Sequence, residues 1–208
     1  MGTRLSRVLS NGDPLSVEGG SPLCESDFDR ARRPSRFPKD SYLLRQPDIS
    51  RLVSVVGPTT INVLVSGGIK SEQLQIAKVI HELSNRRGAA FISVDCAELP
   101  IDPFASEVLG VREGRRPYSS CFDLADGGTL FLDNIDGMSL LFQRKVLRVL
   151  KTRETFGGHA KRHKKIDVRL VAACRRGLSE LVEQEVFDRE LYHLLNIFPI
   201  IVGQQSKN

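Results

Sequence analysis

The chain has 208 residues, of which 40% are hydrophobic and 26% charged, and its net charge is +5. This length suits one ordinary globular domain, and the apolar share is enough to form a core. Residues 151–175 alone carry eight basic and two acidic side chains, an excess larger than that of the whole chain, which excludes a uniformly basic protein and leaves one local basic loop.

The ordered part of the chain is expected to cover residues 42–202. Residues 1–41 are predicted to be a disordered tail, because they are rich in Gly, Ser, Pro and Arg and have few large apolar side chains. A second, short tail is expected at 203–208. The first ordered element should be a helix at 48–56, with Asp48 as its cap.

Strand-like and helix-like segments then alternate. Continuous apolar runs, typical of strands buried on both faces of a sheet, predict strands at 61–68, 89–96, 129–134, 166–174 and 197–202. Apolar residues at helical spacing predict helices at 71–88, 101–110, 138–154, 178–184 and 188–196. Ser71 is expected to cap the first of these helices, and Leu140 and Leu141 are expected to face the core. The alternation predicts an α/β domain with a mostly parallel sheet.

Several classes of protein are excluded by what the sequence lacks. No apolar run approaches the ~20 residues that a membrane-spanning helix needs, and the N-terminus has no apolar segment of a secretory signal. The four cysteines are too widely spaced to indicate a zinc site or a disulfide framework. We therefore expect a cytoplasmic protein with reduced cysteines.

Five blocks of sequence occur in a specific order: VLVSGG, FISVDCAELP, ADGGTLFLDN, QRKVLRVL and FDRELYHLLNIFPI. In this order they resemble the AAA+ domain of bacterial enhancer-binding transcription activators, which is called the sigma-54 interaction domain. The resemblance covers residues 42–202 and implies a P-loop NTPase-like (AAA+) three-layer sandwich. It also implies a hexameric ATPase that uses ATP and Mg²⁺ to remodel RNA polymerase containing sigma-54.

The segment that matches the family's phosphate-binding loop departs from the family pattern. Such a loop needs glycines, whose backbone N–H groups wrap the phosphates, and a lysine that reaches them. Where the family reads G-E-S-G-T-G-K-E, this chain has Gly67, Gly68, Ile69, Lys70, Ser71, Glu72, Gln73 and Leu74. Gln73 takes the position of the lysine, Lys70 lies three residues early, and Glu72 would place a carboxylate next to phosphate. Gly67, Gly68, Lys70 and Gln73 are thus the candidate residues of a degenerate phosphate site.

The other functional positions that the resemblance implies are also substituted. The acidic strand end keeps Asp133, the candidate Mg²⁺ ligand, but has Asn134 where the family has the glutamate that polarises water. An amide cannot act as a base near neutral pH. The sensor position is Arg175, and the positions of the two arginines that reach a neighbouring subunit are Asp188 and Leu194. We therefore predict no catalytic residue, no enzymatic activity and no cofactor.

Two parts of the family pattern are expected to be missing. The loop through which the family contacts sigma-54 carries G-A-F-T-G-A, and between Gly114 and Phe122 this chain has only RRPYSSC. Direct contact with sigma-54 is therefore not expected. The family continues into a helical lid, and because this chain stops at Asn208 the lid subdomain is expected to be absent. The expected partners are intact AAA+ homologues in a hetero-oligomer, without a membrane.

A basic cluster is expected at the exposed tip of a segment that the family folds as a strand-turn-strand excursion. It consists of Lys161, Arg162, Lys164 and Lys165. One interpretation is a contact with a nucleic-acid backbone. The alternative is a solvated loop, because no aromatic side chains are interleaved with the basic ones.

These features favour a degenerate sigma-54-interaction-type module that regulates transcription through interactions and does not hydrolyse ATP. Two alternatives stay open. The first is an ATP-binding, sigma-54-dependent activator with weak or residual ATPase activity. The second is a DNA-binding protein that acts through residues 161–165.

Overall fold

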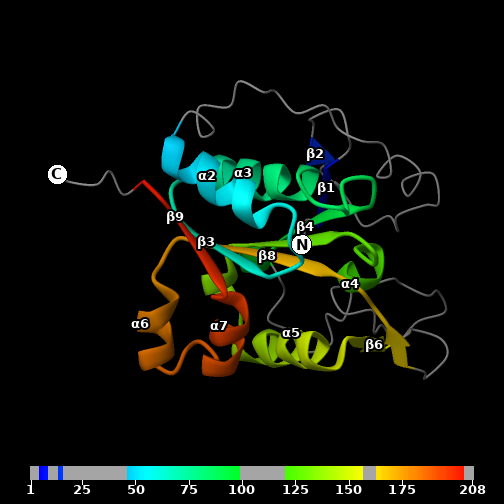
Figure 1. Cartoon of the computed structure of the whole chain (residues 1–208). Helices are drawn as coiled ribbons and strands as arrows, with labels where there is room; N and C mark the ends of the chain where they lie inside the picture. Colours follow the sequence, from blue (N-terminus) through cyan, green and yellow to red (C-terminus); the bar gives the residue numbers. More distant parts are fainter. Residues whose placement is uncertain (1–4, 9–13, 16–45, 99–119, 157–162, 204–208) are drawn as a thin grey trace.

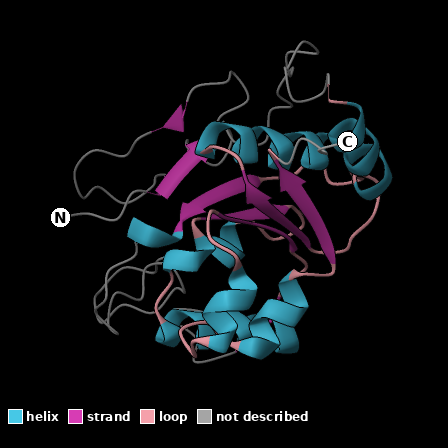
Figure 2. Cartoon of the chain, turned by 90° about the vertical axis from the view of Figure 1, so that its left-hand side faces the viewer, coloured by secondary structure: helices cyan, strands magenta, loops and turns pink. Residues whose placement is uncertain are grey.

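The computed structural model describes residues 5–8, 14–15, 46–98, 120–156 and 163–203. Its centre is a sheet with the strand order β2-β1-β4-β5-β8-β3-β9 (Figures 1 and 2). Five strands run parallel: β3 (Val63–Gly67), β4 (Phe91–Asp95), β5 (Thr129–Asp133), β8 (Arg169–Cys174) and β9 (Phe198–Val202). The short strands β1 (Leu5–Val8) and β2 (Pro14–Leu15) continue the sheet antiparallel beyond β4.

Helices cover both faces of this sheet (Figure 1). One face is covered by α2 (Pro47–Val56) and α3 (Lys70–Glu82). The other face is covered by α5 (Leu140–Thr152), α6 (Leu178–Glu183) and α7 (Arg189–Leu195). The shorter elements are α4 (Cys121–Leu124) and the 3₁₀ helices η2 (Cys96–Glu98) and η4 (Ile135–Gly137).

Successive strand residues feed two separate cores. Val63 and Val65 pack with α2 and α3, whereas Leu64 between them packs with α5 and α7. The same alternation is present in β8, where Val171 and Ala172 belong to different cores. Because both neighbours along a strand are buried, the sequence shows continuous apolar runs. The predicted three-layer α/β fold with a mostly parallel sheet is confirmed.

Three details of the predicted helices are wrong. The helix predicted at 48–56 begins at Pro47 and has no side-chain cap, so Asp48 lies in its first turn. A proline at the first helical position sets the backbone angle and removes an N–H that would have no partner within the helix. The helix predicted at 71–88 begins at Lys70 and ends at Glu82, so Ser71 does not cap it.

The third wrong detail concerns α5, which turns a different stripe inward from the one predicted. Leu140 and Leu141 are 42% and 41% exposed, and Phe142, Val146 and Val149 are buried instead. The helix begins at Leu140, which places both leucines in its first turn. Their side chains therefore lie outside the inward stripe that residues 142, 146 and 149 form at helical spacing.

Some predicted segments are only partly described. Strands β1 and β2 lie within the predicted tail 1–41, and the other residues of that tail, the predicted helix 101–110 and the end of the tail 203–208 lie outside the described residues. The strand-turn-strand excursion is present as β6 (Glu154–Phe156) paired antiparallel with β7 (His163–Lys165). Within the described ranges, no helix is both long and apolar enough to cross a membrane.

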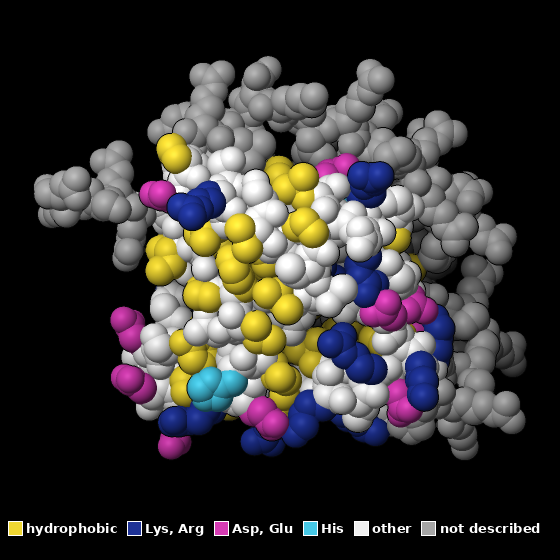
Figure 3. Space-filling model, in the orientation of Figure 1, with side chains coloured by type: hydrophobic (Ala, Val, Ile, Leu, Met, Phe, Trp, Pro, Cys, Tyr) yellow, Lys and Arg dark blue, Asp and Glu magenta, His cyan; other side chains and the backbone are white. Residues whose placement is uncertain are grey.

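Strand β9 is the edge strand next to β3. Its alternate residues Ile200 and Val202 are buried, whereas Pro199 and Ile201 are exposed, as is Ile197 just before the strand. Figure 3 shows hydrophobic side chains gathered over the face of the molecule along which β9 runs in Figure 1.

Candidate functional site

The candidate site lies where the carboxyl ends of the parallel strands meet the first turn of α3. The predicted residues Lys70, Gln73, Asp133 and Asn134 come together here, with Asp95 at the end of β4. Parallel strands end at one edge of a sheet, so residues that follow different strands become neighbours there. Asp95 and Asp133 are direct partners in the register of β4 and β5.

Lys70 bridges the two carboxylates. Its Nζ lies 2.5 Å from Asp95 Oδ2 and 3.4 Å from Asp133 Oδ2. The Asn134 side-chain amide donates a hydrogen bond to Asp95 Oδ1 at 2.9 Å, and the backbone N–H of Ala97 donates to the same oxygen at 3.1 Å. Asn134 has a left-handed backbone, with φ of 50°, a conformation that asparagine tolerates better than most residues. Asn134 therefore follows the acidic end of β5 and contacts a second carboxylate, that of Asp95.

The two carboxyl groups have different proton affinities. Burial would raise the pKa of Asp95, but hydrogen bonds from Lys70, Asn134 and Ala97 and the charge of Lys70 outweigh it, so its pKa lies below the usual value. Burial and the charge of Asp95 raise the pKa of Asp133, and Lys70 offsets this only in part. Burial lowers the pKa of Lys70, but both carboxylates more than compensate, and its pKa is raised. Lys70 is therefore held in its charged form by the acidic pair.

The loop between β3 and α3 packs tightly against Val202 of β9 and against the side chain of Glu72. Gly67 and Gly68 have positive φ angles of 75° and 69°. A Cβ atom on Gly67 would lie 2.5 Å from the carbonyl oxygen of Val202, and one on Gly68 would lie 2.7 Å from Oε2 of Glu72. The same Glu72 oxygen accepts a hydrogen bond from the backbone N–H of Ile69 at 2.9 Å. The glycines therefore allow a close approach of β9 and Glu72 to the loop.

Gln73 joins two strand ends. Its Nε2 donates to the carbonyl oxygens of Gly67 at 2.8 Å and of Cys174 at 2.9 Å, and the residue is fully buried. Its Oε1 has no hydrogen-bond partner among the described residues. The residue at the predicted lysine position thus holds the ends of β3 and β8 together.

The other positions at which this chain departs from the family pattern are Arg175, Asp188 and Leu194. Arg175 is exposed at the end of β8. Asp188 caps α7 and accepts hydrogen bonds from the backbone N–H groups of Glu190 and Leu191. Leu194 is partly buried, and its carbonyl oxygen accepts a hydrogen bond from the side chain of Asn62 at 2.8 Å.

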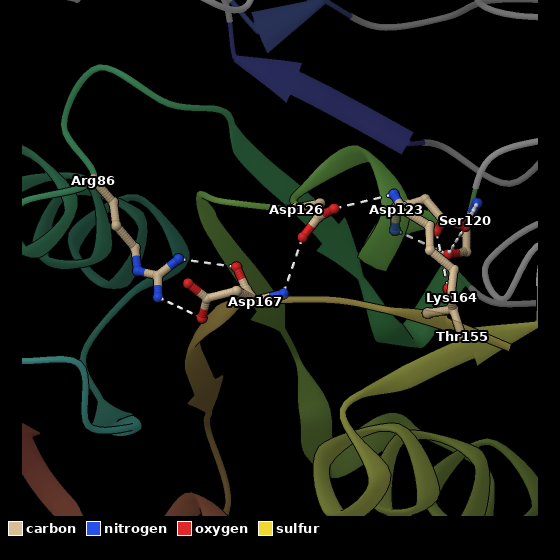
Figure 4. Close-up of polar contacts among 7 residues, drawn as sticks. All are labelled: Arg86, Ser120, Asp123, Asp126, Thr155, Lys164 and Asp167. Atoms are coloured by element: carbon tan, nitrogen blue, oxygen red, sulfur yellow. Dashed lines mark hydrogen bonds and ion pairs between the residues drawn. The ribbon is translucent and has the colours of Figure 1, made fainter.

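The basic excursion contacts Asp126, which lies just before the start of β5 and therefore at the amino-terminal ends of the parallel strands. Figure 4 shows these contacts. Lys164 Nζ lies 3.0 Å from Asp126 Oδ2 and 3.7 Å from Asp123 Oδ1, and Thr155 donates a hydrogen bond to the same Asp123 oxygen. Lys165 is exposed. Lys164 is therefore engaged within the molecule.

Arg86 and Asp167, which are also drawn in Figure 4, extend this cluster toward the end of α3. Arg86 contacts Asp167 Oδ1 at 2.6 Å, and the backbone N–H of Asp167 donates to Asp126. Lys161 and Arg162, the other members of the predicted basic cluster, lie outside the described residues.

Asp95 is the site residue that the sequence-based prediction missed. A signal for it was present, because FISVDC ends in an acid just as TLFLDN does. Two buried strands that both end in an aspartate predict two neighbouring carboxylates, provided that the strands are adjacent.

Comparison with known proteins gives a consistent match. The model of the family described as the sigma-54 interaction domain matches residues 45–201. The nitrogen fixation protein AnfA of Azotobacter vinelandii is 38% identical over 202 residues, which cover 94% of this chain and 37% of AnfA. The regulatory protein LuxO of Vibrio cholerae is 37% identical over 155 residues, or 72% of this chain and 29% of LuxO. The chain therefore spans well under half of the length of these relatives.

Solved structures share the fold. The crystal structure of NtrX from Brucella abortus in complex with ATP matches with a TM-score of 0.68 and 25% identity, over 86% of this chain and 40% of that one. The P-loop NTPase domain of the sigma-54 transport activator from E. coli matches with a TM-score of 0.52 and 18% identity, over 74% of this chain and 92% of that one. The predicted AAA+ P-loop NTPase-like architecture is confirmed.

Proposed function

Because the chain belongs to the sigma-54 interaction domain family, we propose that it is a family module that regulates transcription through protein contacts and does not hydrolyse ATP. The observation that carries the proposal is the placement of Gln73. A phosphate loop needs a cation that reaches the β- and γ-phosphates from the start of the helix. Gln73 is neutral, buried, and already bonded to the carbonyl oxygens of Gly67 and Cys174.

The phosphate side of the site supports the same proposal. A bound phosphate would need hydrogen bonds from backbone N–H groups of the loop. The N–H of Ile69 already donates to an oxygen of Glu72. A carboxylate about 4 Å from a phosphate costs on the order of 1–4 kcal/mol at effective dielectrics between water and a protein surface. With Val202 packed against Gly67 and Gly68, the residues present do not fit a magnesium triphosphate.

The hydrolytic side is weakened by Asn134. Its amide donates to Asp95, and an amide has no proton affinity with which to activate water. Asp133 is retained and lies against Lys70. No step of hydrolysis can therefore be assigned to a base at position 134.

A module without hydrolysis would act by association. We propose that its partners are intact AAA+ homologues, with which it forms a hetero-oligomer in transcription regulation. The alternative is an ATP-binding sigma-54-dependent activator with residual ATPase activity, which the ATP complex of NtrX and the retained Asp133 favour.

An ATPase assay separates these two functions. We expect the purified chain to release no more phosphate from MgATP than a heat-denatured sample, and to give no binding heat with MgATP in calorimetry. A hydrolysing family member serves as the positive control. Phosphate release that disappears in Asp133→Ala would contradict the proposal and establish the activator with residual activity.

Association is tested separately by co-purification with an intact activator of the family. We expect the tagged chain to retain the activator on the resin in the absence of added nucleotide. An unrelated tagged α/β protein of similar size is the control. If no activator is recovered above that control, the interaction part of the proposal is wrong.

A further inference from the structure

We infer that Lys70 is a tethered counter-cation, whose ammonium group replaces a divalent metal ion between Asp95 and Asp133. The carboxyl edge of the sheet is then stable without a metal, and removing Lys70 opens a divalent-cation site there. The inference deepens the proposed function and rests on it, because both assign this edge a state that needs no magnesium nucleotide.

The carboxylates of Asp95 and Asp133 require a cation between them. Asp95 and Asp133 are register partners on adjacent parallel strands, which lie about 4.8 Å apart. Their side chains are only 10% and 3% exposed. Two carboxylates so close and so poorly solvated repel one another, and one of them must be neutralised or both must share a cation.

The cation between these carboxylates is the ammonium group of Lys70. Lys70 Nζ contacts both carboxylates, and among the described residues it is the only basic side chain in an ion pair with either of them. The neighbouring Arg176 is engaged with Asp136 instead, at 3.1 Å. The charge balance of the pair therefore depends on Lys70.

The position of Lys70 allows its ammonium group to take the place of a divalent metal ion. Lys70 is the first residue of α3, and its side chain is 49% exposed while its ammonium reaches the two buried acids. Truncation at this position would open the acids to solvent and leave carboxylate oxygens of both residues facing the vacated volume. Oxygen ligands of this kind are preferred by Mg²⁺, Mn²⁺ and Ca²⁺. A side chain fixed on the helix competes with such an ion at no translational cost.

The test compares the full chain with Lys70→Ala at pH 8, in EDTA and in millimolar MnCl₂. In EDTA we expect the variant to melt about 5 °C below the wild type, because the acidic pair loses its counter-charge. In MnCl₂ we expect the variant to recover most of this loss and to bind Mn²⁺ in a saturable manner by electron paramagnetic resonance. The wild type should show neither effect.

Three further variants fix the interpretation. Lys151→Ala removes an exposed ion pair with Glu190, at 2.8 Å, and should not respond to Mn²⁺. Lys70→Arg keeps the charge and should also not respond. Asp133→Asn in the Lys70→Ala background should abolish Mn²⁺ binding. If Lys70→Ala does not accumulate in folded form, Lys70→Gln, which keeps most of the stem, is measured by the same criteria.

Two outcomes would overturn the inference. One is Mn²⁺ binding by the wild type as strong as that of the variant, and the other is a Lys70 variant that lacks either the loss of stability in EDTA or the gain of Mn²⁺ binding. These results are independent of the ATPase assay. Hydrolysis by the wild type would refute the proposed function, whereas the metal response of the variant refutes or supports the role of Lys70.

Discussion

Replacing Arg169 by alanine is expected to lower the free energy of unfolding by about 4 kcal/mol. Arg169 is the first residue of β8 and only 1% exposed. Its guanidinium donates to the carbonyl oxygens of Gly57 at 2.6 Å and Val56 at 2.8 Å, at the end of α2. The partial negative charge of a helix C-terminus thus stabilises a cation that has no carboxylate in contact with it among the described residues.

The loss has two physical parts. The carbonyl oxygens of Val56 and Gly57 would be buried without donors, and a cavity would replace a large side chain. Burial and the charge of Arg86 lower the pKa of Arg169 to about 10, so the group stays charged at neutral pH and its removal also removes a desolvation cost. This offset is the reason why the expected loss is not larger.

Thermal and urea unfolding measure the effect. The melting temperature should fall by about 10 °C. Arg51→Ala is the matched control, because Arg51 is an exposed residue of α2, and it should change the free energy by less than about 0.5 kcal/mol. A loss in Arg169→Ala no larger than in this control would show that the contacts with α2 contribute nothing.

Acidification from pH 7 to pH 5 is expected to cost the wild type about 2 kcal/mol through His81 alone. His81 is 4% exposed, and its ring contacts Thr129 Oγ1 at 2.9 Å through Nδ1. Burial, together with the charge of Arg169, lowers the pKa of His81 from its ordinary value of 6.5 to about 4.

The sign follows from proton uptake. Between pH 6.5 and pH 4 the unfolded chain binds a proton at this histidine and the folded chain does not, so stability is present above that window and is lost as pH falls through it. Most carboxyl groups titrate below pH 5, which keeps their contribution small over the measured range.

Urea unfolding at pH 7, 6 and 5 checks this expectation. His81→Gln should show a much flatter pH dependence, because it has no group that titrates here. His193→Gln, at an exposed position of α7, should keep the slope of the wild type. Equal slopes in the wild type and in His81→Gln would mean that His81 is protonated as easily in the folded as in the unfolded chain.

The sequence predicts the architecture because the fold depends on local patterns. Runs such as the consecutive apolar residues LFL in TLFLD are sufficient to indicate a strand that is covered on both faces. Helix ends are predicted less well. Ser71 has the chemistry of a cap, but the N–H of Ile69, the residue before the helix, donates to Glu72, and the sequence does not show which side chain prevails.

The candidate site is only partly predictable for a different reason. Gln73 and Asn134 are found by position, but their bonds to Cys174 and Asp95 join residues that lie 101 and 39 positions apart. Lys70 is placed in the loop by its position, whereas its contact with both acids depends on the adjacency of β4 and β5. The role of Arg169 likewise depends on Val56 at the end of α2, 113 residues earlier. Such contacts follow from strand order and not from spacing along the chain.

The edge strand β9 has a consequence for the behaviour of the chain in concentrated solution. Within the described ranges, β9 has no strand on its outer side. Its exposed Pro199 and Ile201 offer a hydrophobic surface there, but proline has no N–H, which interrupts the row of donors that an added strand would need. Fibril-like growth by strand addition is therefore hindered at this edge. Association there should instead proceed through packing of exposed side chains such as Ile197 and Ile201.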